Sequence, residues 1–174
     1  MSVKYINITK RDIANGPGVR VVLWLSGCTH RCPGCHNEHT WDANIGDVFT
    51  EKIKEELFAA LSPAYISGIT FSGGDPLHEN NLEDILFLIE EIREKMPEKT
   101  IWLYTGYMWE NIKENQNDIN MQTREKIIEN IDVLVDGPFI LKLKNIMLPW
   151  CGSSNQRVID VKESIKERSL VLYK

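Results

Sequence analysis

Hydrophobic residues along the chain follow two different spacings. Short runs rich in β-branched and aromatic residues predict four buried strands, at residues 19–25, 69–71, 101–104 and 133–135. Segments in which apolar residues recur every three or four positions predict two amphipathic helices, at residues 50–62 and 82–96, each closed by a proline. The first half of the chain therefore alternates strands with helices.

The remaining segments are less regular. Residues 107–130 are polar and are predicted to be helical, with a break at an Asn-rich centre formed by Asn115, Asn117 and Asn120. Residues 157–174 predict a strand, a short helix and a second strand. This order of elements is typical of an α/β fold with a mostly parallel sheet. A closed eight-stranded β/α barrel needs about 250 residues. The chain has 174 residues, so we expect a partial (open) β/α barrel made of a single domain, residues 1–174.

Unusual polar and glycine-rich segments follow each of the four predicted strands. They are Gly27-Cys28, Ser72-Gly73-Gly74-Asp75, Thr105-Gly106 and Asp136-Gly137-Pro138. Ligands of open α/β sheets bind beyond the carboxyl ends of the strands. The pattern therefore predicts a site at that edge of the sheet.

Charge and composition exclude some classes of function. The net charge is −5 and no basic stretch could track a phosphate backbone, which argues against a nucleic-acid partner. The first residues lack the apolar core of a signal peptide, and the apolar runs are too short to span a bilayer. We therefore expect a cytoplasmic protein with no membrane partner. Three of the four cysteines fall within eight residues, and clustered thiols in a reducing cytosol more often bind metal or do redox chemistry than form disulfides.

The clustered cysteines have the spacing C-x₃-C-x₂-C. Cys28, Cys32 and Cys35 could hold three irons of a [4Fe–4S] cluster and leave the fourth iron open for a substrate. A zinc site completed by His39 or His36 is an alternative with the same three thiols. A dithiol redox pair of Cys32 and Cys35 is a weaker alternative, because it leaves Cys28 unexplained.

The cysteine segment resembles a known family. VVLWLSGCTHRCPGCHN (residues 21–37) and the preceding GPGVR resemble the cluster region of the radical SAM superfamily, in particular its activating enzymes for glycyl-radical proteins. FSGGDPL (71–77) resembles the second motif of the superfamily. The segments that most resemble activators of anaerobic ribonucleoside-triphosphate reductase are YTGY (104–107), VDGPF (135–139) and GSSNQRVID (152–160).

The resemblance implies an iron–sulfur enzyme that uses S-adenosylmethionine. Cys28, Cys32 and Cys35 would ligate the cluster, and S-adenosylmethionine would bind the open iron. Reductive cleavage would give a 5′-deoxyadenosyl radical, which would remove a hydrogen atom from a glycine of anaerobic ribonucleoside-triphosphate reductase. An activase of another glycyl-radical enzyme, of the pyruvate formate-lyase type, is the close alternative. A reduced protein such as flavodoxin would supply the electron.

The resemblance also assigns residues to the second cofactor. Gly73 and Gly74 would let the backbone approach the amino end of S-adenosylmethionine, and Asp75 could accept a hydrogen bond from its ammonium group. An aromatic residue usually precedes the third cysteine of this superfamily, but Gly34 stands there, so His36 becomes the candidate for contact with the adenine. Cys151 is assigned no ligand role. The run of hydrogen-bonding residues at 152–157 either caps the sheet or meets a ligand or partner, and the resemblance favours the second.

Overall fold

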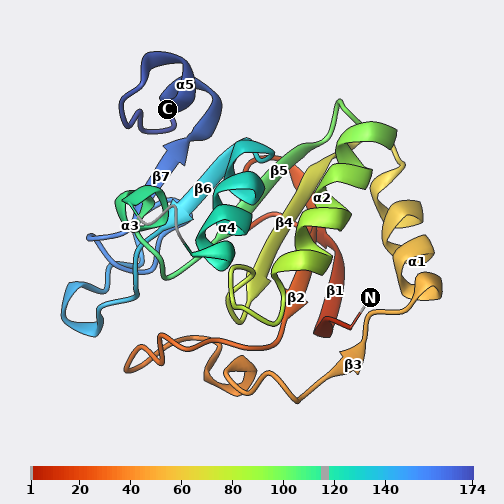
Figure 1. Cartoon of the computed structure of the whole chain (residues 1–174), viewed down its shortest axis with the longest axis horizontal. Helices are drawn as coiled ribbons and strands as arrows, with labels where there is room; N and C mark the ends of the chain where they lie inside the picture. The colour runs from red at the N-terminus through yellow and green to blue at the C-terminus, as the bar shows by residue number, and fades with distance from the viewer. Residues whose placement is uncertain (1, 115–117) are drawn as a thin grey trace.

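One mixed sheet forms the centre of the molecule (Figure 1). The computed structural model describes residues 2–114 and 118–174. Within these residues seven strands form the sheet in the order β3-β1-β2-β4-β5-β6-β7. Their bounds are β1 Lys4–Asp12, β2 Val19–Leu25, β3 Asp47–Val48, β4 Ile66–Gly73, β5 Thr100–Tyr104, β6 Val133–Asp136 and β7 Arg157–Asp160. The four central strands β2, β4, β5 and β6 are parallel, whereas β1, β3 and β7 pair antiparallel at the edges. The expected mostly parallel sheet is therefore confirmed for its centre.

Helices cover one face of this sheet. The α-helices are α1 Glu51–Leu61, α2 Leu82–Lys95, α3 Trp109–Glu114, α4 Ile119–Glu129 and α5 Val161–Glu167, and two short 3₁₀ turns lie at η1 Glu38–Thr40 and η2 Leu141–Leu143. Figure 1 shows α2 and α4 in front of the strands and α1 beside them, at the right of the view. The periodic stripe of α2 is fully buried there, through Leu82, Ile85, Leu88, Ile89 and Ile92. The Thr50 side chain caps α1 by accepting a hydrogen bond from the Ile53 amide.

Most predicted elements are present, and the differences lie at the ends of the chain. The sequence patterns did not predict β1 or β3. The second strand expected in the C-terminal tail is wrong, because Leu172 makes only an isolated bridge to Ile159. The helical segment 107–130 forms α3 and α4, and Asn115 and Asn117 of its expected break lie outside the described residues. None of the helices in the described ranges has the length and apolar character needed to cross a membrane.

A buried arginine links three strands on the face of the sheet that α1, α2 and α4 do not cover. Arg20 on β2 is fully buried and donates hydrogen bonds to the Thr70 hydroxyl and to the carbonyls of Ile69 and Thr100. Its guanidinium also lies over the ring of Trp102 at 5.4 Å. Trp102 in turn packs edge-on against aromatic rings of the C-terminal part, Trp150 and Tyr173. These contacts fix the register of the central strands, whose opposite ends carry the site.

Candidate iron–sulfur site

The four parallel strands end at the same edge of the sheet. Leu25 at the end of β2 pairs with Gly73 at the end of β4, and Tyr104 at the end of β5 pairs with Val135 on β6. The segments that follow these strands line one open cavity, to which Cys28, Gly74, Thr105 and Gly137 each contribute. The structure therefore brings together the four segments that the strand pattern had placed at one edge.

The cysteine loop follows β2 directly. Its start is fixed by backbone hydrogen bonds, because the Gly27 amide donates to the Thr40 carbonyl and the Cys28 amide donates to the Trp41 carbonyl. A tight turn closes the other end, where the Cys35 amide donates to the Cys32 carbonyl at 3.0 Å. The three thiols, which form no disulfide, line the cavity. The loop thus presents all three sulfurs to one space.

Burial disfavours the thiolate form of Cys28 and Cys32 by raising the pKa of both thiols. It raises the pKa of Cys28 to about 11, and the charge of Asp75 adds to the shift. Burial also raises the pKa of Cys32. A thiolate in such a place needs a strong positive charge beside it, which bound iron would provide while protons are released. The amide of Asn37 already donates to the Cys35 sulfur at 3.4 Å, as hydrogen bonds do around sulfur ligands of iron.

The donor set fits an iron–sulfur cluster. Each cysteine of a cubane cluster binds a different iron, so the sulfurs surround a space rather than converge on one point. The described residues contain no group of three or more His, Cys, Asp or Glu side chains placed to hold a single metal ion. The cavity wall also contains Trp41, whose buried indole N–H has no hydrogen-bond partner in the described part of the chain. A polar group in the cavity would satisfy it.

The glycine pair after β4 lies against the start of the cysteine loop. Gly73 has a φ of +102°, and a Cβ there would lie 2.7 Å from the Leu25 backbone. A Cβ on Gly74 would lie 2.5 Å from the Gly27 carbonyl oxygen. Hydrogen bonds join the same segments, from the Gly74 amide to Leu25 and from the Asp75 amide to Gly27. Both positions need glycine because the chain itself approaches so closely.

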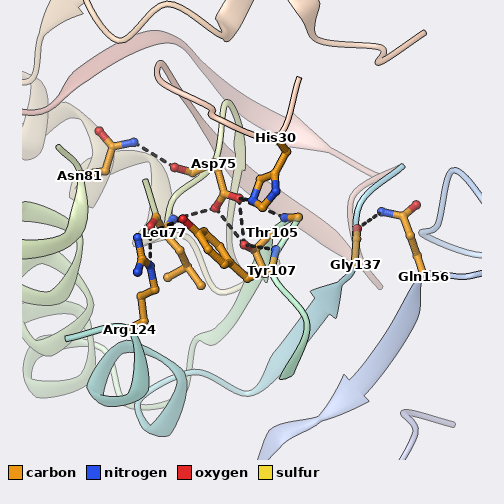
Figure 2. Close-up of polar contacts among 10 residues, drawn as sticks. His30, Asp75, Leu77, Asn81, Thr105, Tyr107, Arg124, Gly137 and Gln156 are labelled. Carbon is orange, nitrogen blue, oxygen red and sulfur yellow. Dashed lines mark hydrogen bonds and ion pairs between the residues drawn. The ribbon is translucent and has the colours of Figure 1, made fainter. Parts of the chain in front are cut away.

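Asp75 is buried at the centre of a set of donors (Figure 2). It is 2% exposed, and its carboxylate accepts hydrogen bonds from the Thr105 hydroxyl and from the amides of Leu77 and Gly106. The His30 Nε2 atom lies 2.9 Å from Asp75 Oδ2. Protein donors thus surround the carboxylate, and its contact with the ammonium group of S-adenosylmethionine stays a prediction.

Gly34 and His36 lie away from this cavity. Both are exposed, and neither belongs to its lining. Gly34 has a φ of +74°, which explains glycine in the turn, and a Cβ there would touch the Leu141 side chain at 3.1 Å. A contact of either residue with the adenine stays untested.

The polar run at 152–157 supports the turn after β6. The Gln156 side chain donates to the Gly137 carbonyl at 3.0 Å and accepts from the amides of Gly152 and Ser153, and Asn155 donates to the Pro138 carbonyl. Figure 2 shows the Gln156 contact. Sequence reasoning did not single out Gln156, Phe139, Asn37 or Trp41, which also line the cavity. These residues follow the ends of strands or the motif residues in the sequence, and that proximity could have indicated that they line the cavity.

Cys151 lies elsewhere. It is half-buried beside Trp102, outside the lining of the cavity, and burial raises the pKa of its thiol to about 11. That Cys151 has no ligand role stays a prediction.

Fold and site together define an α/β protein that presents a three-cysteine loop at the carboxyl ends of its parallel strands. The family model described as a 4Fe-4S single cluster domain matches residues 14–159. Relatives from Salmonella typhimurium and Escherichia coli are each 46% identical over 149 residues, which cover 84% of this chain and 92% of theirs. A relative from Enterobacteria phage T4 is 42% identical over 156 residues, 90% of this chain and 93% of its own. All three are named anaerobic ribonucleoside-triphosphate reductase-activating protein, and the chain belongs to this family.

Proposed function

We propose that the chain activates anaerobic ribonucleoside-triphosphate reductase by generating a glycyl radical on it. In this proposal Cys28, Cys32 and Cys35 hold a [4Fe–4S] cluster, and the iron without a cysteine ligand binds S-adenosylmethionine. The observation that carries the proposal is that the three thiols and the Gly73-Gly74 turn face one cavity. The names of the relatives support the choice of partner.

The bound cluster would supply one electron for the reductive cleavage of S-adenosylmethionine to methionine and a 5′-deoxyadenosyl radical, which takes a hydrogen atom from glycine. The protein has three tasks in this chemistry. The cysteine loop holds the cluster, and the backbone of Gly73 and Gly74 holds the methionine end of the cofactor. Trp41 and Phe139 line the same cavity, and their aromatic side chains would limit the access of water to the reacting groups.

The proposal includes a fold type and an electron donor. We assign the sheet to the partial (open) β/α barrel of the radical SAM superfamily, with residues 1–174 as one domain. Four parallel strands with helices on one face support this assignment. The electron is proposed to come from a reduced protein such as flavodoxin.

The first test is anaerobic reconstitution with iron and sulfide, followed by dithionite and S-adenosylmethionine. We expect a brown protein that bleaches in air and releases 5′-deoxyadenosine, measured by chromatography. Cys28→Ala, Cys32→Ala and Cys35→Ala should each abolish this release, because each removes a ligand. Cys151→Ala is the matched control and should retain it. A colourless protein with stoichiometric zinc and no reconstitutable iron would contradict the cluster assignment.

The second test identifies the partner. The reconstituted protein is mixed with anaerobic ribonucleoside-triphosphate reductase, and the glycyl radical is measured by electron paramagnetic resonance. We expect the radical on the reductase and not on pyruvate formate-lyase. The reverse result would favour the alternative activase.

A further inference from the structure

His30 lies between the first two cysteines of the loop and points back into the protein. Its side chain is 20% exposed, and its Nε2 atom is buried 2.9 Å from Asp75 Oδ2. The contact has the distance of an ion pair without the alignment of a hydrogen bond. The imidazole also packs edge-on against Tyr107, with ring centroids 4.6 Å apart and an interplanar angle of 79°. Figure 2 shows the ring directed at the carboxylate.

The turn that follows β5 leaves room for the His30 ring. A Cβ on Gly106 would lie 2.4 Å from the His30 Cδ2 atom, so the missing side chain of Gly106 leaves the space that the imidazole fills. The Gly106 amide donates to the same Asp75 carboxylate that His30 contacts. Glycine at position 106 therefore allows the cysteine loop and the turn after β5 to contact the same carboxylate, that of Asp75.

Tyr107, which packs against the His30 ring, is held in place by Arg124 on α4. Arg124 donates to the Tyr107 hydroxyl at 3.0 Å and to the Leu77 carbonyl at 2.9 Å, and its guanidinium lies 4.4 Å from the Tyr107 ring centroid. Arg124 is buried. The surroundings of His30 thus come from the glycine turn after β4, the end of β5 and a buried arginine on α4.

We propose that His30 is a positioning residue that sets the placement of the cysteine thiols relative to the Gly73-Gly74 turn. It lies two residues from Cys28 and two from Cys32, so a shift of its backbone moves both sulfurs. Its anchor, Asp75, directly follows the turn proposed to hold S-adenosylmethionine. His30 therefore fixes the distance between the cluster site and the cofactor site. This role rests on the proposed function, although its structural part does not need it.

The structural part is tested on the cluster-free chain. The alkylation rate of each cysteine is measured by mass spectrometry under reducing, anaerobic conditions. In His30→Ala, Cys28 and Cys32 should react about fivefold faster, the factor for loss of roughly 1 kcal/mol of local stabilisation, while Cys151 keeps its rate. Gly106→Ala should act in the same direction because its methyl group displaces the ring. Equal acceleration at Cys151 would mean global destabilisation, and unchanged rates at Cys28 and Cys32 would also overturn the proposal.

His39→Ala is the matched control for these measurements. His39 is an exposed histidine of the neighbouring η1 turn and lies outside the cavity lining. Its removal should leave the alkylation rates of all the cysteines unchanged. An acceleration as large as that of His30→Ala would overturn the proposal, because any histidine near the loop would then have the same effect.

The functional part is tested on the reconstituted protein. His30→Ala should keep the iron and sulfide content of the wild type, and its Kd for S-adenosylmethionine should rise about tenfold, within the range that outer contacts of metal sites produce. The change that S-adenosylmethionine causes in the electron paramagnetic resonance spectrum of the reduced cluster should weaken in parallel. His30→Gln keeps a donor for Asp75 and should stay within about threefold of the wild type.

The outcomes separate this proposal from the function it rests on. If the wild type neither binds nor cleaves S-adenosylmethionine, the proposed function fails, and the alkylation rates still decide the role of His30. If the wild type cleaves S-adenosylmethionine and His30→Ala binds it with unchanged affinity, only the positioning role fails. Low cluster content with unchanged affinity in the loaded fraction would likewise indicate a purely structural residue and refute positioning.

Discussion

Replacing Asp75 with asparagine tests the view that this carboxylate holds the site together from inside. The carboxylate receives donors on both oxygens: the Leu77 amide reaches Oδ1 at 2.8 Å, and the Gly106 amide reaches Oδ2 at 3.0 Å. The Thr105 hydroxyl lies 2.9 Å from each oxygen. An asparagine keeps one acceptor and places an NH₂ group against the donors on the other side. One backbone N–H must then lose its partner, or the turn must move.

The magnitude follows from these contacts. A buried backbone donor without a partner costs about 1–3 kcal/mol. Loss of the carboxylate charge beside His30 adds roughly 1–2 kcal/mol, because the buried Nε2 atom is then left without a charged partner. We therefore expect Asp75→Asn to lower the free energy of unfolding by about 2–5 kcal/mol, a large part of the roughly 5–15 kcal/mol of a whole domain.

Urea unfolding of the cluster-free chain, followed by circular dichroism with reductant present, measures this loss. With a slope of about 2 kcal/mol per molar urea, the midpoint should fall by roughly 1–2.5 M. The control is Asp118→Asn at the N-terminus of α4, where the side chain accepts a hydrogen bond from the Asn120 amide. Asparagine caps a helix as well as aspartate, so this variant should stay within ~0.5 kcal/mol. A loss below about 1 kcal/mol for Asp75→Asn would refute the reasoning and would favour a direct role in binding S-adenosylmethionine.

Two further predictions concern the sheet away from the site. Gly68→Ala should lower the free energy of unfolding by about 2 kcal/mol or more, since its Cβ would lie 1.9 Å from the Thr100 carbonyl oxygen of the neighbouring strand; a neutral result in urea unfolding would contradict this packing. Burial alone would raise the pKa of Asp132, but hydrogen bonds from Lys162 and Arg93 contribute to holding it below the ordinary 3.8. The ionised form therefore stabilises the fold above about pH 4, and this contribution is lost as the pH falls through the depressed folded value. Unfolding free energies measured between about pH 5 and 2 should fall more steeply for the wild type than for Asp132→Asn; parallel curves would refute the assignment.

The hydrophobic pattern of the sequence predicted the strands whose residues are mostly buried from end to end. The central strands β2, β4, β5 and β6 are mostly buried along their length, so their central residues read as short apolar runs. Edge strand β1 is different. Most of its residues are only half-buried, and its pairing with β2 shifts register between Tyr5 and Asn7 and again between Thr9 and Asp12. These irregularities break the period of two that identifies a strand, and β3, with two exposed residues, leaves no pattern at all.

Part of the candidate site could likewise be predicted from the sequence, and part could not. The cysteine loop and the Gly73-Gly74 turn could be placed at one edge because parallel strands end there. The contact of His30 with Asp75 could not, because it joins residues 45 positions apart through the packing of three segments. The same holds for Gln156, whose role depends on β7 pairing antiparallel beside β6 and so reaching the Gly137 carbonyl. Motif spacing locates the chemistry, whereas tertiary packing decides which side chains support it.

The glycines at this edge of the sheet show how a sequence motif and tertiary packing are related. From sequence, Gly73 and Gly74 suggested that a backbone must approach a ligand closely. In the structure the close approach is made by the chain itself, by Leu25 at Gly73, by the Gly27 carbonyl at Gly74 and by the His30 ring near the next strand end. These contacts are made within the chain itself, so folding contributes to ordering the cysteine loop. Contacts of this kind hold the cysteine loop at a fixed distance from the turn, and fixed geometry is what the proposed reaction between the cluster and S-adenosylmethionine would require.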